Sequence, residues 1–191
     1  MIEYMKEMDK LGMIIFEILA HGLGIEEEHF FSKNFEEKEA AYFRISRYPP
    51  CPLPEKIVEI GIHSDSQTLT MLHQDQVGGL QVLKDDKQWA EVRPIPNSFV
   101  INIGGNLETN GRLKSAIHRA MVNKEKQRLS IAYFMSPTSN ATIECPPHLI
   151  HPISNPRKYV PFTWAELRHL LLTTRRVRGK AVALSKFCIS N

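Results

Sequence analysis

Residues 57–83 read IVEIGIHSDSQTLTMLHQDQVGGLQVL, and this stretch decides the fold class. It holds three short apolar or alternating runs, Ile57–His63, Leu69–His73 and Leu80–Leu83, and the pair Gly78-Gly79 predicts a turn before the last of them. Runs of this length with turn residues between them are typical of β-strands. The stretch therefore predicts consecutive strands rather than helices.

The same pattern continues on both sides, from Ala41 to Ser136. Turn-forming clusters of Pro, Gly, Asn and Asp again separate short apolar runs. The further candidate strands are Tyr42–Tyr48, Phe99–Ile103, Ser115–Met121 and Leu129–Phe134. Many short strands at close spacing predict an antiparallel sandwich or barrel, so the fold class is mainly β.

Helical patterns flank this β region. Residues 2–22 carry apolar side chains at three- and four-residue steps, which predicts an amphipathic helix whose methionines fill core space. Towards the other end, Thr163 and Glu166 form a capping box before a leucine-rich stripe. We expect a helical segment at residues 1–40 packing on the barrel, a β core at 41–140, and a C-terminal loop and helix at 141–191.

Composition excludes several classes of protein. The chain is 42% hydrophobic and 24% charged with a net charge of +3, which is ordinary for a globular protein. No apolar run approaches the roughly 20 residues that cross a bilayer, and acidic residues from Glu3 onward argue against a signal peptide, so we expect a cytoplasmic protein without a membrane partner. The basic run Arg175–Lys180 is interpreted as a solvated helix end, not a nucleic-acid surface. Cys51, Cys145 and Cys188 lack C-x-x-C spacing and are interpreted as reduced thiols.

The segment Gly61–Ser66 contains the residues that predict chemistry. Alternate residues of a strand share a face, so His63 and Asp65 point the same way and can take adjacent positions on one metal ion. His118, on a later candidate strand, is the best third ligand. Two histidines and one carboxylate leave open positions on the metal, as in non-haem Fe(II) oxygenases. A His-x-Asp pair alone is weak evidence, because such a pair is more often simply exposed and polar.

Arg128 and Ser130 strengthen this hypothesis. They lie two residues apart on another probable strand, downstream of His118. A guanidinium can hold a carboxylate through two parallel hydrogen bonds, and a neighbouring hydroxyl adds a third. The pair therefore suits the distal carboxylate of a dicarboxylate whose other end chelates the metal. Taken alone, it would be interpreted as an exposed arginine beside a serine.

Eight short motifs follow one another between about residues 42 and 136, and residues 159–166 add a further match. The motifs are Tyr48-Pro49-Pro50-Cys51-Pro52, His63-Ser64-Asp65, Leu69-Thr70-Met71-Leu72, Gly78-Gly79-Leu80-Gln81-Val82, Asn102-Ile103-Gly104, Asn110-Gly111-Arg112, His118-Arg119-Ala120 and Arg128-Leu129-Ser130. In this order they resemble the catalytic portion of the plant-type 2-oxoglutarate- and Fe(II)-dependent dioxygenases, the group with flavonol synthase, anthocyanidin synthase and the gibberellin oxidases.

This resemblance implies a distorted double-stranded β-helix, a cupin-like jelly roll with helices outside. It also implies an iron site and a site for the distal carboxylate of 2-oxoglutarate. The residues concerned are His63, Asp65 and His118 for iron, and Arg128 and Ser130, with the Tyr48 hydroxyl as a further donor, for the carboxylate. The role of Tyr48 comes from the resemblance only, and a tyrosine leading into a proline turn is the alternative.

The function implied is that of an oxidoreductase. Fe(II), 2-oxoglutarate and O₂, with ascorbate in support, would hydroxylate, desaturate or dealkylate a small molecule of plant secondary metabolism, such as a hormone or a phenolic. Succinate and CO₂ would be released. We expect a small-molecule partner, no nucleic acid, and a monomeric chain.

Three departures from the family pattern bear on activity. Family members usually carry a further N-terminal region before the segment that matches Met1, so we expect a truncated chain whose uncovered strands favour self-association. Ser46 stands where the family has Asn, and Gly105 where it has Asp. Residues 107–110 form a stretch two residues shorter than the family's. Removing two residues from a strand preserves the face of later side chains, so His118 can still point inward.

Two other functions remain open. A truncated, catalytically weak or silent paralogue would bind only metal or small molecules. A zinc hydrolase would need a general base and would leave Arg128 and Ser130 without a role. The other histidines lack partners at ligand spacing, although His73 follows a candidate strand near the pocket and is a candidate substrate contact.

Overall fold

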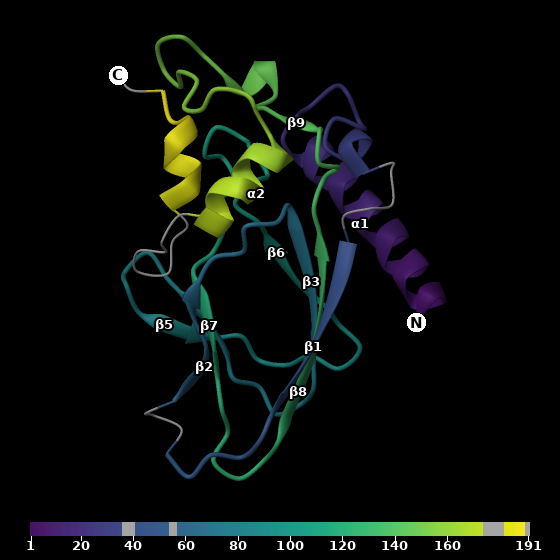
Figure 1. Cartoon of the computed structure of the whole chain (residues 1–191), viewed down its shortest axis with the longest axis vertical. Coiled ribbons are helices and arrows are strands. Elements are labelled where there is room, and N and C mark those ends of the chain that lie inside the picture. The colour runs from purple at the N-terminus through teal and green to yellow at the C-terminus, as the bar shows by residue number, and fades with distance from the viewer. Residues whose placement is uncertain (36–40, 54–56, 174–181, 190–191) are drawn as a thin grey trace.

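Two four-stranded antiparallel sheets form the centre of the computed structural model, which describes residues 1–35, 41–53, 57–173 and 182–189 (Figure 1). The first sheet has the order β1 (Ala41–Tyr48), β8 (Arg128–Met135), β3 (Leu69–Gln74) and β6 (Val100–Ile103). The second has the order β2 (Val58–His63), β7 (His118–Met121), β4 (Leu80–Leu83) and β5 (Trp89–Glu91). The prediction of a mainly β, antiparallel fold is confirmed.

The strand predictions hold except where strands are very short. Six of the seven predicted runs match their strands to within a residue at each end. The seventh, Ser115–Met121, is a strand only from His118, and Ser115 instead donates a hydrogen bond to the Asp65 carbonyl at 3.3 Å. The unpredicted strands are β5 and the paired β9 (Thr142–Ile143) and β10 (Phe162–Thr163). Two or three residues are too few to show a period.

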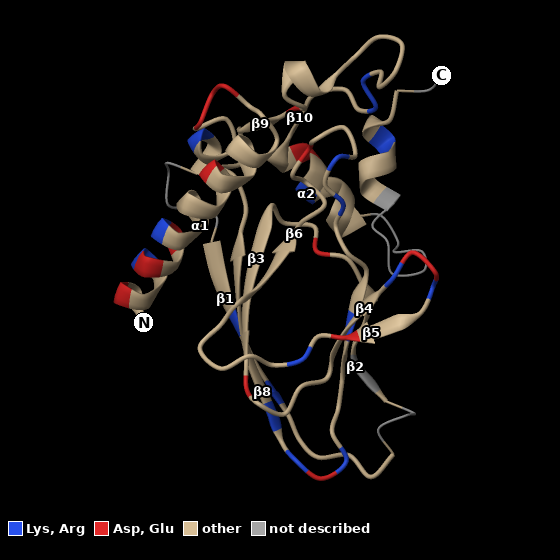
Figure 2. Cartoon of the chain, turned by 180° about the vertical axis from the view of Figure 1, so that it is seen from behind, with Lys and Arg blue, Asp and Glu red and all other residues tan. Residues whose placement is uncertain are grey.

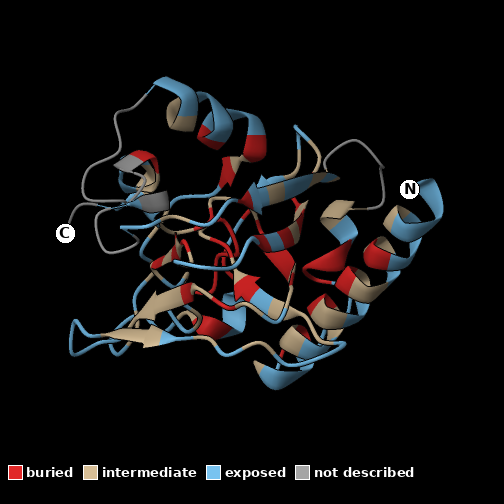
Figure 3. Cartoon of the chain, turned by 90° about the horizontal axis from the view of Figure 1, so that it is seen from below, coloured by how far each residue is buried: buried red, intermediate tan, exposed pale blue. Residues whose placement is uncertain are grey.

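Helix α1 (Ile2–Gly22) packs on the outer face of the first sheet (Figures 1 and 3). Its buried residues are spaced four apart, and Phe16 is fully buried, which contributes roughly 1.5–3 kcal/mol. Gly12 allows the helix to pack close to β8, because a Cβ at this position would lie 2.1 Å from the Met135 sulfur. The Tyr133 hydroxyl donates a hydrogen bond to Asp9, which ties the helix to the sheet.

The predicted capping box begins helix α2 (Trp164–Thr173). Glu166 accepts hydrogen bonds from the Thr163 amide at 2.7 Å and from its hydroxyl at 2.8 Å, and the Glu166 amide donates back at 3.2 Å. The two hydrogen bonds that Glu166 accepts lower the pKa of its carboxyl. The remaining elements are the short helices η1 (Ser32–Phe35), η3 (Pro147–Leu149) and η4 (Val182–Phe187).

Charged residues of both signs alternate along α1 and at the loop ends in Figure 2. The basic run predicted as a solvated helix end, Arg175–Lys180, lies outside the described residues. Within the described ranges, no helix combines the length and apolar composition needed to cross a membrane.

Candidate metal centre

The three predicted ligand residues meet between the two sheets. His63 is the last residue of β2, His118 is the first of β7, and the two strands pair at these positions. Asp65 follows β2 by two residues. One potential ligand atom from each of the three lies within 4.8 Å of the others. Strand pairing thus brings together residues that are far apart in the sequence.

Each histidine presents Nε2 to the carboxylate. The distance from His63 Nε2 to Asp65 Oδ1 is 3.7 Å, and that from His118 Nε2 is 3.6 Å. Each Nδ1 instead faces a backbone carbonyl two residues earlier, that of Gly61 at 2.6 Å and that of Ala116 at 3.1 Å. A carbonyl accepts from a protonated Nδ1, which leaves the lone pair on Nε2. Such an anchored tautomer is how metal-bound histidines are usually oriented.

Asp65 tests whether these residues fit a metal ion. The residue is 6% exposed, and its Oδ2 atom has no hydrogen-bond partner among the described residues. A buried carboxylate oxygen without a partner is costly, whereas a divalent cation would satisfy it. Two imidazole lone pairs converging on this carboxylate make a donor set that suits Fe(II). The residues present therefore fit the metal.

Arg128 lies deeper between the sheets and is 1% exposed. Its guanidinium donates to Ser130 Oγ at 3.3 Å and to Gln74 Oε1 at 3.4 Å. Both contacts are long, and Nε has no hydrogen-bond partner within the described part of the chain. A buried guanidinium whose N–H groups make only long hydrogen bonds can still donate to a bound carboxylate.

Tyr48 meets Arg128 through its ring. The Arg128 guanidinium carbon lies 4.7 Å from the centre of the Tyr48 ring, a cation–π contact, and the two residues pair directly across β1 and β8. The face of the Tyr48 ring thus packs against the guanidinium of Arg128.

All six predicted site residues line one hollow of about 500 Å³, which we call the inter-sheet pocket. The residues that the sequence did not identify include Arg44 and Phe134, on the strands that carry Tyr48 and Arg128, and Thr70 and Asn102, on the neighbouring strands β3 and β6. Counting every second residue from Arg128 and from Tyr48 would have found Phe134 and Arg44. Gln74, which holds Arg128, has no such signal in the sequence.

The candidate substrate contact His73 does not reach this pocket. Thr70 and Leu72 of β3 line the pocket, and the ring of His73 lies 6.0 Å from that of Phe99. Because successive side chains of a strand alternate in direction, His73 points to the opposite face of the sheet. This prediction was wrong.

The stretch after β6, which we predicted to be shorter than in the family, supports the backbone of Asp65. The Gly105 amide donates to the Asp65 carbonyl at 2.7 Å. Gly104 lies so close to the preceding loop that an added Cβ would meet the Gln67 carbonyl oxygen at 1.6 Å. Asp65 also borders a wider hollow of about 1970 Å³ towards α2, which neither His63 nor His118 lines. Since all three ligand residues line the inter-sheet pocket, they would hold a metal ion at that pocket.

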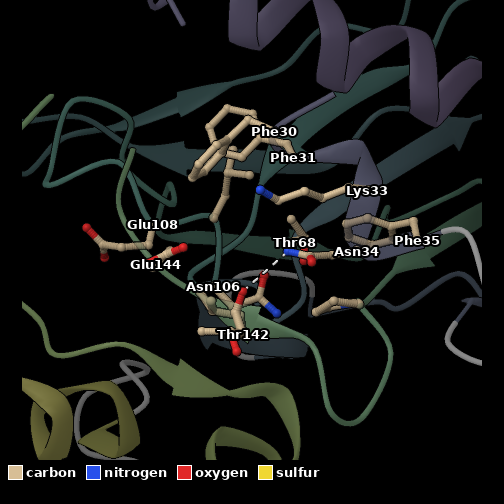
Figure 4. A pocket seen from close by; sticks show the side chains of 13 residues that line it. Phe30, Phe31, Lys33, Asn34, Phe35, Thr68, Asn106, Glu108, Thr142 and Glu144 are labelled. Carbon is tan, nitrogen blue, oxygen red and sulfur yellow. Dashed lines mark hydrogen bonds between the residues drawn. The ribbon is translucent and has the colours of Figure 1, made fainter. Parts of the chain in front are cut away.

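A separate hollow of about 390 Å³ lies beside η1, and we call it the η1 hollow. Figure 4 shows Phe30 and Phe31 on one side of it and Asn106 and Thr142 on the other. Asn106 is 2% exposed, and neither of its amide atoms has a hydrogen-bond partner among the described residues. Burial raises the pKa of Glu108, against the opposing effects of the Asn110 amide and of Lys158 and Arg157.

Comparison with known proteins identifies the family of this chain. Residues 39–137 match the family described as the 2OG-Fe(II) oxygenase superfamily. The chain is 41% identical over 190 residues to gibberellin 20 oxidase 3 of Arabidopsis thaliana, covering 98% of this chain and 49% of the relative. It is 38% identical over 187 residues to gibberellin 20 oxidase 2 of Oryza sativa subsp. indica, covering 97% of this chain and 46% of the relative. The chain spans about half the length of these curated relatives.

Solved structures agree. The chain is similar to JOX2 crystallised with 2OG, Fe and JA, with a TM-score of 0.84 and 34% identity over 98% of this chain and 55% of that one. It is also similar to the rice dioxygenase for auxin oxidation, with a TM-score of 0.81 and 30% identity over 98% of this chain and 62% of that one. These likenesses confirm the predicted double-stranded β-helix.

Proposed function

This chain belongs to the 2OG-Fe(II) oxygenase superfamily, and from that premise we propose that it oxidises a small organic molecule with O₂ and 2-oxoglutarate at an Fe(II) ion. In this proposal His63, Asp65 and His118 hold the metal on one face, and Arg128 and Ser130 hold the distal carboxylate of 2-oxoglutarate. When bound, iron and 2-oxoglutarate supply the oxidising chemistry and release succinate and CO₂.

The observation that carries the proposal is the orientation of the two histidines. Each imidazole has Nδ1 against a backbone carbonyl and Nε2 towards the same buried carboxylate. Two exposed histidines near an acid would have no reason to share this arrangement. The chain's part in catalysis is to fix these three groups, which would hold the metal beside the pocket.

Arg128 supports the second half of the proposal. Its side chain is buried, charged and held by weak contacts, and such a group is costly unless a counter-ion completes it. A carboxylate seated on the guanidinium would also reach the Ser130 hydroxyl. Tyr48 and Gln74 then act on the position of the guanidinium.

We propose a small plant metabolite as the substrate. The relatives are named gibberellin 20 oxidases, and a structural neighbour is named for auxin oxidation, so a plant hormone is favoured over a phenolic. The walls of the inter-sheet pocket combine six apolar residues with ten that carry polar or charged groups, so they can contact both the body and the polar groups of a small molecule.

A direct assay tests the proposal. Purified chain is incubated with Fe(II), ascorbate and 2-oxoglutarate, and succinate is measured with and without a plant metabolite extract. We expect the extract to raise succinate formation in the natural chain and in His151→Ala, but not in His118→Ala. If Fe(II) and 2-oxoglutarate bind and succinate never forms, the oxygenase proposal is wrong.

That outcome would favour a second candidate, a silent relative that only binds metal or small molecules. The observation behind it is the stretch after β6, which contains Gly105 and buries polar residues. The buried polar residues of this stretch are Asn106, Glu108, Thr109 and Asn110. Because the same stretch holds the Asp65 carbonyl, strain there would act on the metal centre.

A further inference from the structure

Thr70 is the third residue of the inter-sheet pocket with a buried polar atom that has no hydrogen-bond partner among the described residues. The other two atoms are Asp65 Oδ2 and Arg128 Nε, and the proposed function gives the first a metal ion and the second a carboxylate. It gives no partner to the Thr70 hydroxyl, although the residue is only 3% exposed. A buried hydroxyl that makes no hydrogen bond is costly, so a ligand that completes it gains affinity.

Thr70 lies beside a second free polar side chain, that of Asn102. The two residues pair directly across β3 and β6, and both line the pocket. Asn102 is 9% exposed, and its side-chain amide makes no hydrogen bond with any residue that the structure describes. Directly opposite residues of two strands have Cβ atoms about 4.5–5.5 Å apart, so one ligand group can contact both side chains.

This pair lies at the metal end of the pocket. A short loop leads from Asp65 into β3, and Thr70 is the second residue of that strand. The Gly105 amide, three residues after Asn102, donates to the Asp65 carbonyl at 2.7 Å. Both strands therefore meet the metal centre at the end where the hydroxyl and the amide lie.

The distance along β3 suits a five-carbon diacid. Gln74, whose Oε1 atom accepts from Arg128 at 3.4 Å, follows Thr70 by four residues, so their Cα atoms lie about 13 Å apart at about 3.3 Å per residue. Extended 2-oxoglutarate, with C–C bonds of about 1.5 Å, measures about 7 Å between its outermost oxygens. A hydrogen bond at each end adds about 3 Å. A 2-oxoglutarate molecule held at Arg128 thus has the length to reach Thr70 with its other carboxylate.

Resting on the proposed function, we propose that the Thr70 hydroxyl, together with the Asn102 amide, binds the metal-end carboxylate of 2-oxoglutarate. A 2-oxo acid that chelates a metal uses one oxygen of this carboxylate and leaves the other free to accept hydrogen bonds. A hydroxyl and an amide can both donate, and a hydrogen bond to an ionised acceptor is stronger than one between neutral groups. The first sheet then holds the cosubstrate at both ends, and Thr70 is a cosubstrate-binding residue.

Thr68 offers a matched control for Thr70. Its hydroxyl is also buried and without a partner in the described part of the chain, but the residue lines the η1 hollow. Valine replaces a threonine hydroxyl with a methyl group of similar size. Thr70→Val and Thr68→Val therefore remove equivalent groups from two different hollows, whereas Thr70→Ser keeps the hydroxyl in the pocket.

The test titrates 2-oxoglutarate without oxygen into the natural chain and the three variants, each loaded with Fe(II). Calorimetry gives the affinity, and the iron–2-oxoglutarate absorbance reports the surroundings of the chelating carboxylate. Affinity for Fe(II) and the melting temperature of the metal-free chain are measured for all four. These two quantities show whether a substitution acts on the metal ligands or on the fold.

We expect Thr70→Val to bind 2-oxoglutarate at least tenfold more weakly, because it loses a hydrogen bond to a charged group. Its iron–2-oxoglutarate absorbance maximum should also move, while its Fe(II) affinity stays that of the natural chain. Thr70→Ser should retain most of the 2-oxoglutarate affinity. Thr68→Val should resemble the natural chain in every binding measurement.

Several results would overturn the proposal. These are an unchanged 2-oxoglutarate affinity in Thr70→Val, an equal loss in Thr68→Val, and a loss in Thr70→Ser as large as that in Thr70→Val. A loss of Fe(II) binding in Thr70→Val would also overturn it, since the hydroxyl would then act on Asp65. A natural chain that binds neither Fe(II) nor 2-oxoglutarate would contradict the proposed function itself, and this inference with it.

Discussion

The inter-sheet pocket and the η1 hollow both contain buried polar atoms without hydrogen-bond partners in the described part of the chain. In the pocket these atoms include Asp65 Oδ2 and Arg128 Nε, which belong to side chains of opposite charge. Arg128 lies on β8, and Asp65 follows β2 by two residues. In the η1 hollow they include the Thr68 hydroxyl and both amide atoms of Asn106. These groups are neutral, and Asn106 lies on the connection after β6.

The difference shows when an unpartnered polar atom indicates a binding site. Leaving such a group buried costs about 1–3 kcal/mol when it is neutral and more when it is charged. In the pocket, two imidazole lone pairs and a carboxylate converge, so a ligand that binds only the folded chain can offset this cost. The unpartnered atoms of the η1 hollow are neutral, and no histidine lines it beside its charged residues Lys33, Glu108 and Glu144. It is interpreted as a consequence of how the connection after β6 packs, and changes in the two hollows test this contrast.

The largest effect is expected from removing a metal ligand. His118→Ala should abolish stoichiometric Fe(II) binding, because two remaining ligands cannot hold the ion against water. In the natural chain, Fe(II) at 100 times its dissociation constant should stabilise the fold by about 2.7 kcal/mol, and this stabilisation should vanish in the variant. Anaerobic calorimetric titration and thermal unfolding measure the two quantities.

The matched control is His151→Ala. His151 lies in an exposed turn, where its ring accepts hydrogen bonds from the backbone amides of Ile153 and Ser154. Its loss should leave the Fe(II) stoichiometry at one. Equal loss of binding in both variants would point to unfolding or to a different metal site, and the contrast between the two hollows would fail.

A smaller effect is expected at the far end of the pocket. Arg128→Lys keeps the charge but loses the planar fork, so affinity for 2-oxoglutarate should fall tenfold or more, about 1.4 kcal/mol or above. Fe(II) binding should survive. Arg47→Lys, on the outer face of β1, is the control, and isothermal titration of the metal-loaded chains measures the difference. Unchanged affinity in Arg128→Lys would remove Arg128 from the proposed cosubstrate site.

Sequence patterns predicted the fold and the position of the triad because both depend on local rules. The alternation of side chains along a strand placed His63 with Asp65 and Arg128 with Ser130, and the structure keeps each pair on one face. The same rule, applied further, would have placed His73 on the outer face and Arg44 inside. The prediction for His73 was wrong because its closeness in sequence to residues of the pocket was taken for closeness in space.

Other features were out of reach of the sequence. The Nδ1 contacts of His63 and His118 depend on ring orientation, which no spacing encodes. Gln74 reaches Arg128 only because β3 pairs with β8 in one particular register. The burial of Asn106 and Glu108 depends on how the connection after β6 packs against the core, and no pattern in these polar residues indicates it.

The smallest effect is expected in the η1 hollow, at Glu108. Burial raises the pKa of this carboxyl above its usual value, so the folded chain holds the proton more tightly than the unfolded chain does. The stability that this provides is fully present below the ordinary pKa of a glutamate and is lost as pH rises through the folded-state pKa.

Glu108→Gln removes the titration but keeps an oxygen that can accept from the Asn110 amide. The free energy of unfolding, measured in urea across a pH series, should therefore be similar for the two chains at acidic pH and higher for Glu108→Gln at neutral pH. Glu144→Gln, at an exposed carboxylate that lines the same hollow, is the control and should show no such divergence. A Glu108→Gln chain that is less stable than the natural one at neutral pH would mean that the charged carboxylate is needed there, and the η1 hollow would then have to be treated as a site.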